Sequence, residues 1–142
     1  MRDPSEFIKI NIANMHFTAR LERNLSPITC QKFCAVLPFR AKVIQARWSG
    51  EAAWIPLSHY DLGVEKEGIT GSPNAGEILF HPADHSECEI LIPYGKSAFR
   101  CKDGDLAGNH FLTIVEGQQL LEKLGELVLW QGSQNIEFSY SS

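Results

Sequence analysis

Near each end of the chain, a run of alternating residues leads directly into a short helical pattern, and this arrangement constrains the fold most. In residues 17–21, apolar side chains alternate with polar ones, as a strand with one buried face requires. Ser26 is suited to the N-cap of a helix and Pro27 to its first position, where the missing N–H costs nothing. The apolar side chains of residues 30–37 then fall on one stripe of a short helix that ends at Pro38.

The last third of the chain repeats this order. Residues 111–115 are rich in β-branched and aromatic side chains, which favours a strand, and residues 118–124 follow with a helical pattern. Gly125 is typical of a residue that ends a helix, and residues 128–130 could either prolong the helix or begin a strand. Residues 136–140 alternate again, which predicts a closing strand.

These segments resemble the cyclophilins: residues 17–37 are similar to their first strand and helix, and residues 111–121 to their late strand and turn. Four further segments resemble a family of small bacterial cyclophilin-like proteins of unknown function: Arg-Trp-Ser-Gly-Glu at 47–51, Gly-Glu-Ile-Leu at 76–79, Ile-Pro-Tyr-Gly at 92–95 and Asn-His-Phe at 109–111. The resemblance implies a mainly β fold, a closed cyclophilin-like eight-stranded antiparallel β-barrel with two short helices capping its ends. It predicts a barrel and not an activity.

Size and composition agree with one domain. The 142 residues are enough to bury a core without disulfides or metal, so residues 1–142 are predicted to form a single cyclophilin-like domain. A net charge of −4 argues against a nucleic-acid partner. No apolar run approaches the roughly 20 residues of a membrane helix, and the N-terminus does not resemble a secretion signal. We therefore predict a cytoplasmic bacterial protein with four reduced cysteines, no membrane partner and no cofactor.

The resemblance to cyclophilins implies part of a prolyl isomerase site. Arg47 is matched, through the resemblance, to the arginine with which cyclophilins hydrogen-bond near the prolyl nitrogen, and residues 106–111 place His110 near the same pocket. The apolar and amide half of the cyclophilin site has no counterpart, so only a weak peptidyl-prolyl cis-trans isomerase remains as an alternative. A simpler interpretation of Arg47 is a strand charge that pairs with Glu51 or faces solvent.

A metal-dependent enzyme is another alternative, because His81, His85 and Glu87 supply imidazole and carboxylate ligands. The turn that contains them gives no fixed direction to the rings, so we predict no metal site and expect solvated or locally hydrogen-bonded histidines. Glu87 and Glu89 lie two residues apart on one face of a strand, where repulsion could raise the pKa of one carboxyl group. We expect both to be exposed to water.

The leading hypothesis is a binding groove. Trp48 and Trp54 are separated by an even number of residues, so both rings face the same side of a continuous strand. We expect them to line a groove for a small organic molecule, such as an organic acid, or a short peptide, together with Arg47, Glu51, Tyr94 and His110. The alternative is that both tryptophans fill the barrel core. A homo-oligomeric interaction module, held by a strand edge or an aromatic patch, is a further possibility.

Overall fold

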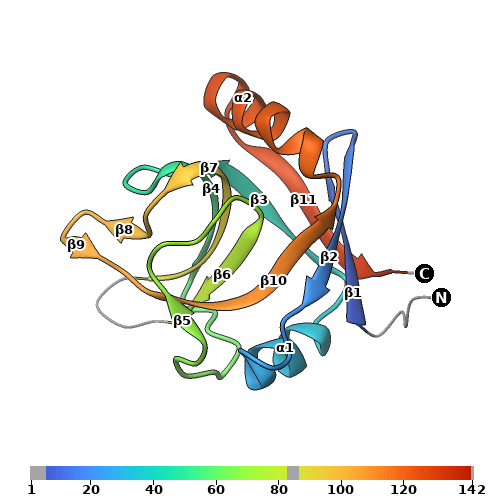
Figure 1. The fold of residues 1–142 in the computed structure, drawn as a ribbon, viewed down its shortest axis with the longest axis vertical. Coiled ribbons are helices and arrows are strands. Elements are labelled where there is room, and N and C mark those ends of the chain that lie inside the picture. The colour runs from blue at the N-terminus through green and yellow to red at the C-terminus, as the bar shows by residue number, and fades with distance from the viewer. Residues whose placement is uncertain (1–5, 83–86, 142) are drawn as a thin grey trace.

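A computed structural model describes residues 6–82 and 87–141, and it is built mainly of strands. Figure 1 shows the two α-helices at opposite ends of the strand layer. The elements are β1 (Phe7–Ile12), β2 (Met15–Leu21), α1 (Pro27–Cys34), β3 (Phe39–Gln45), β4 (Gly50–Ser58), β5 (Ile69–Thr70), β6 (Glu77–His81), β7 (Cys88–Ser97), β8 (Arg100–Cys101), β9 (Gly104–Asp105), β10 (Gly108–Glu116), the 3₁₀ turn η2 (Gln118–Leu120), α2 (Leu121–Gln131) and β11 (Gln134–Tyr140).

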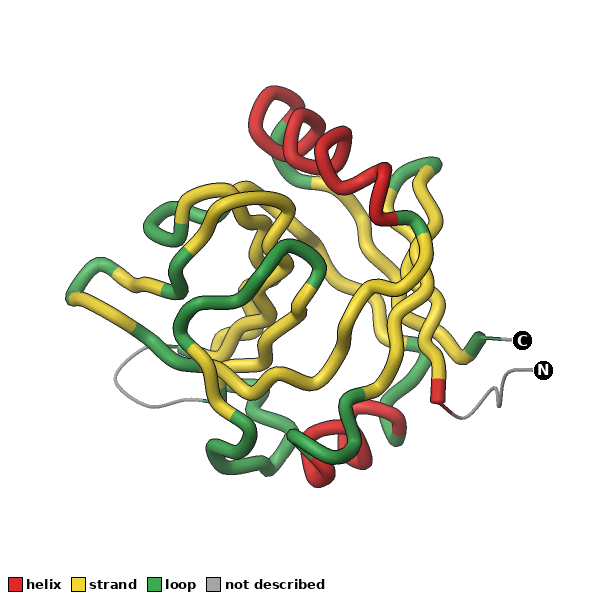
Figure 2. Tube along the Cα trace, viewed as in Figure 1, coloured by secondary structure: helices red, strands yellow, loops and turns green. Residues whose placement is uncertain are grey.

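Eight strands close into a barrel. They follow the order β2-β1-β11-β3-β4-β7-β6-β10, and β10 pairs again with β2, every pairing being antiparallel. The short strand β5 adds to β10, while β8 and β9 form a separate two-stranded hairpin outside the barrel (Figure 2). The eight-stranded closed barrel with two short helices that the sequence predicts is therefore confirmed. Closure gives each of the eight long strands a paired neighbour on both sides, and the β3–β4 pairing is short, with Ile44 opposite Trp54 and Gln45 opposite Ala53.

The predicted strand–helix unit near the N-terminus is present. Strand β2 alternates as predicted, with Phe17 and Ala19 facing the barrel core. Helix α1 places Phe33 against the core, where its ring meets Phe111 and Phe138 edge to face at centroid distances of 5.1 Å. Strand β1, which the sequence reasoning missed, buries every second residue in the same core.

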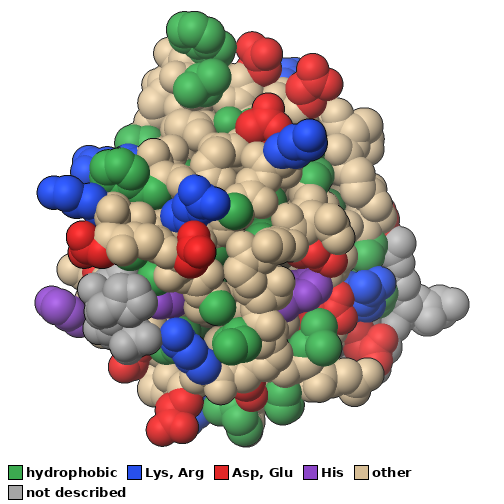
Figure 3. All heavy atoms as spheres, turned by 60° about the vertical axis from the view of Figure 1, so that its left-hand side comes forward, with side chains coloured by type: hydrophobic (Ala, Val, Ile, Leu, Met, Phe, Trp, Pro, Cys, Tyr) green, Lys and Arg blue, Asp and Glu red, His purple; other side chains and the backbone are tan. Residues whose placement is uncertain are grey.

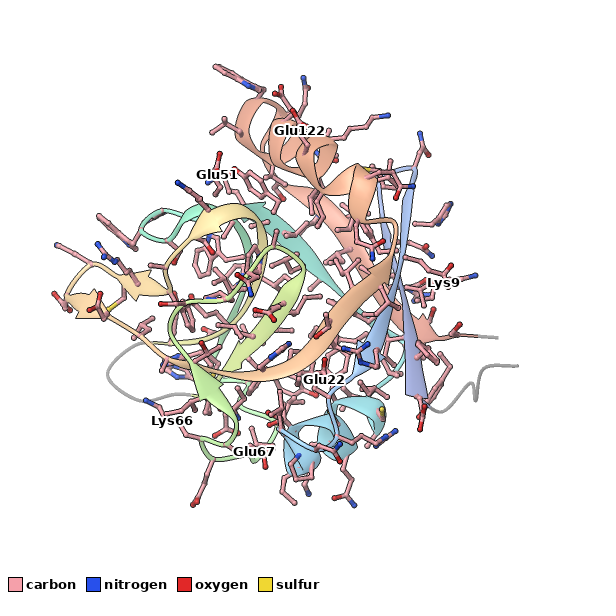
Figure 4. All side chains as sticks on the ribbon, viewed as in Figure 1. Lys9, Glu22, Glu51, Lys66, Glu67 and Glu122 are labelled. Atoms are coloured by element: carbon pink, nitrogen blue, oxygen red, sulfur yellow. The ribbon has the colours of Figure 1, made fainter. Side chains whose placement is uncertain are left out.

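The start of α1 is held by a different residue than the sequence suggests. Ser26 precedes the helix, but its hydroxyl makes no cap and instead donates to the carbonyl oxygen of His110 at 2.8 Å. The carboxylate of Glu67 takes the capping role by accepting hydrogen bonds from the Thr29 backbone N–H at 2.6 Å and the Thr29 hydroxyl at 2.7 Å. Glu67 lies in the loop before β5 and beside α1 in Figure 4, so this contact joins the loop to the helix.

Gly125 does not end the second helix. Helix α2 runs through it to Gln131, so residues 128–130 prolong the helix. The glycine has a packing role, because a Cβ atom at this position would lie 2.2 Å from Cε1 of Tyr94. The helix ends instead before Gly132, whose φ of 80° is a conformation that side chains disfavour.

A second, smaller apolar layer lies outside the barrel. Strands β4, β6 and β7 send alternate residues inward to the core, and the residues between them face outward. The outward residues Leu79 and Leu91 pack against Phe99 and Leu106, which flank the β8–β9 hairpin. The hairpin therefore covers part of the outer barrel surface. None of the helices in the described ranges is long and apolar enough to span a bilayer.

Candidate functional site

A cavity of about 190 Å³ opens on the outer barrel surface where the β8–β9 hairpin meets the turn before β4 and the start of β7. We call it the tryptophan cavity. Its lining includes Arg47, Trp48, Trp54, Glu89, Arg100 and Cys101. Figure 3 brings the hairpin side of the molecule forward and shows basic and acidic side chains beside apolar ones on this face.

Glu89 is the unusual residue of the tryptophan cavity. It is only 8% exposed, although it lies on the outer side of the barrel. In the part of the chain that the structure describes, its carboxyl group forms no hydrogen bond and no ion pair. Burial, and to a smaller extent the charge of Glu87, raises the pKa of Glu89 to about 7. The expected exposure of Glu89 is therefore wrong, and a raised carboxyl pKa is found, mainly because of burial and only secondarily because of repulsion.

His81 lies next to Glu89, directly opposite it in the β6–β7 pairing. It is 0% exposed, its ring meets Phe99 edge to face at 5.6 Å, and its Nδ1 lies 3.2 Å from the carbonyl oxygen of Glu87. A carbonyl can only accept, so Nδ1 carries a proton. The ring is therefore buried rather than solvated, and it is locally hydrogen-bonded.

His85, the second histidine of the metal hypothesis, lies outside the described residues. Within residues 6–82 and 87–141, no group of three or more His, Cys, Asp and Glu side chains could hold a metal ion.

Trp54 presents a polar atom without a partner. It stands opposite Leu91 in the β4–β7 pairing and packs on the outer apolar layer, so it does not fill the barrel core. Its indole Nε1–H is buried and finds no hydrogen-bond acceptor among the described residues. Glu89 is two residues from Leu91 on the same strand, hence a diagonal neighbour of Trp54 on the same face. The lining of the cavity thus contains a buried N–H donor and the carboxyl group of a buried residue, and neither has a hydrogen-bond partner within residues 6–82 and 87–141.

Cationic side chains surround the mouth of the tryptophan cavity. Arg47 is exposed and, within the described part of the chain, forms neither a hydrogen bond nor an ion pair. It does not pair with Glu51, whose carboxylate instead accepts a hydrogen bond from the Lys96 backbone N–H at 2.7 Å. Arg100 forms an ion pair of 3.2 Å with Asp105. Arg47 is therefore the cation most available to a bound molecule.

Trp48, Ser49 and Arg100 also line a second, wider hollow of about 600 Å³, which we call the open hollow. Its other wall includes residues 72–75 and the end of β7. The hydroxyl of Ser97, also in its lining, is buried without a hydrogen-bond partner among the described residues. The two spaces share Trp48, Ser49 and Arg100 and therefore adjoin, and the half-exposed Trp48 borders both.

Tyr94 lies elsewhere, at the end of the barrel that α2 covers. Its hydroxyl donates to Oε1 of Gln45 at 2.6 Å, and its ring packs against Gly125. Burial raises the pKa of the Tyr94 hydroxyl. Tyr94 therefore positions α2 against the end of the barrel.

His110 lies on β10, separated from β4 by β7 and β6. A bulge between His110 and Leu112 places His110 and Thr113 on the same face. The Nε2 atom of His110 lies 2.8 Å from the Thr113 hydroxyl, which donates to the Glu22 carboxylate at 2.5 Å. Burial alone would raise the pKa of Glu22, but hydrogen bonds from Thr113 and Arg20 lower it. Figure 4 shows Glu22 where β2 meets α1, and His110 does not line the tryptophan cavity.

The residues expected to form one groove thus lie in separate places. Arg47, Trp48 and Trp54 line the tryptophan cavity, whereas Glu51, Tyr94 and His110 do not. Sequence reasoning did not assign Glu89, Arg100 or Cys101 to the site. No local signal could have done so, because the hairpin that encloses them folds back from beyond the end of β7.

All four cysteines are free thiols, as predicted. Burial raises the pKa of Cys30 to about 12 and also raises the pKa of Cys34, so the cysteines of α1 are poor nucleophiles.

The family model for "Protein of unknown function (DUF3830)" matches residues 8–140 of the chain. The chain belongs to the DUF3830 family. A search of curated proteins found no match for this DUF3830 protein. Membership shows the family and leaves the activity undefined.

Two solved structures share the fold. The structure of McbB in complex with tryptophan superposes with a TM-score of 0.74 at 14% identity, over 95% of the DUF3830 chain and 45% of the McbB chain. The DUF3830 chain therefore spans less than half the length of McbB. The solution structure of the hypothetical protein AF2241 from Archaeoglobus fulgidus superposes with a TM-score of 0.60 at 15% identity, over 99% of this chain and 98% of that one. These likenesses show the fold alone.

Proposed function

We propose that this DUF3830 protein binds a small organic molecule, such as an organic acid or a short peptide, in the tryptophan cavity. The observation that carries the proposal is that one cavity is lined by Glu89, a buried residue, and by Trp54, whose Nε1–H is buried. Neither the Glu89 carboxyl group nor the Trp54 N–H has a hydrogen-bond partner among the described residues. Leaving a buried polar group unpaired costs about 1–3 kcal/mol. A ligand that forms hydrogen bonds with both groups removes this cost, whereas the free protein has no compensation for it.

The surroundings of the cavity favour a ligand with an acidic group. Arg47 and Lys102 are exposed cations in the cavity lining without an ion-pair partner among the described residues. A carboxylate at the cavity mouth would be attracted to both, and an arginine can hold it through two parallel hydrogen bonds. Apolar contact comes from the rings of Trp48 and Trp54.

The shape supports the same proposal. About 190 Å³ suits a molecule of roughly amino-acid size, and the adjoining open hollow gives room for the rest of a peptide. McbB, which shares the fold, has been solved in complex with tryptophan. For these reasons we place amino acids and short peptides in the first set of compounds to be tested.

We further propose that the protein is a cyclophilin-like bacterial protein of the cytoplasm. The eight-stranded barrel with a helix at each end and the similar segments at residues 47–51 and 92–95 support the cyclophilin relationship. Four free cysteines support a reducing compartment. Fractionation of cells that express the protein tests the location, and recovery outside the cytoplasmic fraction would contradict it.

A thermal-shift screen of organic acids, amino acids, amines and short peptides tests the binding proposal. We expect at least one compound to raise the melting temperature, and the rise should increase with the logarithm of the ligand concentration above the Kd. Arg47→Gln and Trp54→Phe should each reduce the shift, while the matched controls Arg40→Gln and Trp130→Phe, far from the cavity lining, should retain it. Equal shifts in the cavity variants and the controls would contradict the proposal.

Self-association is a second candidate, favoured by one observation. Helix α2 exposes Trp130 by 74% and the neighbouring Leu129 by 53%. Next to them, Met15, Leu120 and Leu127 line a hollow of about 480 Å³. An exposed apolar surface of this kind suits a second copy of the chain. Size-exclusion chromatography with light scattering should give a dimer for the wild type and a monomer for Trp130→Gln, and a wild-type monomer at all concentrations would contradict this candidate.

A further inference from the structure

We infer that the ligand of the tryptophan cavity is a zwitterion of the amino-acid type. Its ammonium group binds Glu89, and its carboxylate binds the Trp54 indole N–H and Arg47. This inference rests on the proposed function and specifies the ligand class of the same site. It is drawn from the distribution of charge around the cavity.

The inner end of the cavity lacks a cation. Glu89 is more than nine-tenths buried, and no Lys, Arg or His among the described residues lies within ion-pair distance of its carboxyl group. The like charge of Glu87, which also lines the cavity, acts on it. A carboxylate of a buried residue that has no ion-pair partner among the described residues attracts a cation. The rings of Trp48 and Trp54 in the same lining add the aromatic surface on which ammonium groups bind well.

The outer part of the lining has the opposite character. Arg47 and Lys102 are exposed and unpaired within the described residues, and Trp54 contributes a buried Nε1–H donor to the same lining. These groups donate hydrogen bonds and accept none, so they select an oxygen acceptor with negative charge. A molecule with only an ammonium group would leave them unpaired, and one with only a carboxylate would leave Glu89 unpaired. An amino acid satisfies both.

The pH dependence of binding follows from the pKa of Glu89 of about 7. Glu89 attracts an ammonium group only when it is ionised, so affinity for an amino acid should rise as the pH rises through 7. Between pH 6 and pH 8 the ionised fraction grows about tenfold, and apparent affinity grows with the competent fraction. A carboxylic acid without an ammonium group should lose affinity over the same range.

Other titratable or charged groups of the described residues also lie around the cavity. They are Glu87 on the same segment, His81 on β6, Arg47 before β4, and Arg100, Cys101, Lys102 and Asp103 at the hairpin.

Calorimetric titration with matched compounds tests the inference. Each L-amino acid found in the thermal-shift screen is compared with its deaminated acid and its decarboxylated amine, for example L-tryptophan with indole-3-propionate and tryptamine, or L-leucine with 4-methylpentanoate and 3-methylbutylamine. We expect both derivatives to bind at least tenfold more weakly than the parent amino acid at pH 8. We also expect the affinity for the amino acid to be about tenfold higher at pH 8 than at pH 6.

Two variants separate the two ends of the ligand. Glu89→Gln should weaken binding of the amino acid at least tenfold and leave the deaminated acid unchanged at pH 8 or bind it more tightly. Arg47→Gln should weaken the amino acid and the deaminated acid but leave the amine unchanged. Glu122→Gln, an exposed residue of α2, is the matched control and should bind like the wild type.

The possible failures are distinguishable. If deaminated acids bind as tightly as amino acids, and Glu89→Gln binds both like the wild type, the zwitterion inference is wrong and the proposed function stands. The same holds if compounds other than amino acids bind and lose affinity in Arg47→Gln and Trp54→Phe. If no compound of the screen binds, both the inference and the proposed function are contradicted.

Discussion

Glu89 on β7 lies directly opposite His81 on β6, and both side chains are buried on the outer side of the barrel beneath the β8–β9 hairpin. Titratable side chains on the outside of a barrel are ordinarily solvated. Here the ring of Phe99 lies against His81, and residues 100–103 of the hairpin enclose the cavity that Glu89 lines. The hairpin therefore turns a solvent-facing surface into a site where a carboxyl group has a raised pKa.

The burial of Glu89 should lower stability at high pH. Its pKa rises from 4.5 in the unfolded chain to about 7 in the folded protein, so between these values the folded state holds a proton that the unfolded state has lost. The free energy of unfolding therefore falls as the pH rises through this window, by on the order of 3 kcal/mol from this group. Glu89→Gln removes this contribution. Urea unfolding should show the difference between variant and wild type growing in favour of the variant from pH 4 to pH 8.

The matched control for this series is Glu122→Gln. Its free energy of unfolding should stay within about 0.5 kcal/mol of the wild-type value at every pH, as for most surface substitutions. If the free energies of unfolding of Glu89→Gln and wild type change in parallel with pH, the pKa of Glu89 is the same in the folded and unfolded protein. That result would remove the main support for the site.

Gly125→Ala should destabilise the protein, although alanine is normally the better helix residue. In an ordinary exposed helix the change stabilises by about 1 kcal/mol. Here the new Cβ would lie 2.2 Å from the Tyr94 ring, and overpacking costs about 1–3 kcal/mol. Thermal or urea unfolding measures the effect. Adding Tyr94→Leu should recover part of the loss, and a Gly125→Ala variant as stable as the wild type would contradict the packing described for α2.

Thr113→Val should lower the free energy of unfolding by about 1–3 kcal/mol, because it leaves the Glu22 carboxylate and the His110 ring without their shared hydroxyl. Since this network does not line the tryptophan cavity, ligand binding should be unaffected at temperatures where the variant is folded. Loss of binding in folded Thr113→Val would show instead that His110 belongs to the binding site.

Glu67→Gln should weaken the start of α1. A carboxylate accepts stronger hydrogen bonds than an amide oxygen, and Glu67 accepts two from Thr29. We expect a loss of about 1 kcal/mol, in the range found for removed helix caps. Hydrogen exchange should show faster exchange of the first amides of α1. Glu65→Gln, an exposed residue of the same loop, serves as the control, and equal effects of the two changes would contradict the capping role.

The barrel could be predicted from the sequence because its strongest signals are local. The alternation of residues 17–21 and the Ser26–Pro27 start of α1 depend only on neighbouring residues, and both are present in the structure. Gly125 was misjudged because its reason is a contact with Tyr94, thirty-one residues earlier in the chain. Local patterns carry no information about such a contact.

The site was predictable only in part for the same physical reason. The even spacing of Trp48 and Trp54 predicted a shared side of one continuous strand. Both residues line one cavity, but β4 begins only at Gly50, so Trp48 lies in the turn before the strand and the spacing does not explain the shared lining. Glu89 lines a cavity whose opposite wall is formed by residues 100–103, which fold back toward β7 from later in the chain. The position of His110 relative to Thr113 depends on a bulge that changes the side-chain alternation of β10. Neither feature has a signature in the local sequence.

The most direct test of the binding site is the ¹⁵N–¹H NMR spectrum of the three tryptophan indole groups during titration with the amino acids of the screen. The Trp54 signal, assigned by its loss in Trp54→Phe, should move and saturate as its unpaired N–H gains an acceptor, while the Trp130 signal on α2 stays in place. An unchanged Trp54 signal at ligand concentrations far above the Kd measured by calorimetry would contradict binding in the tryptophan cavity.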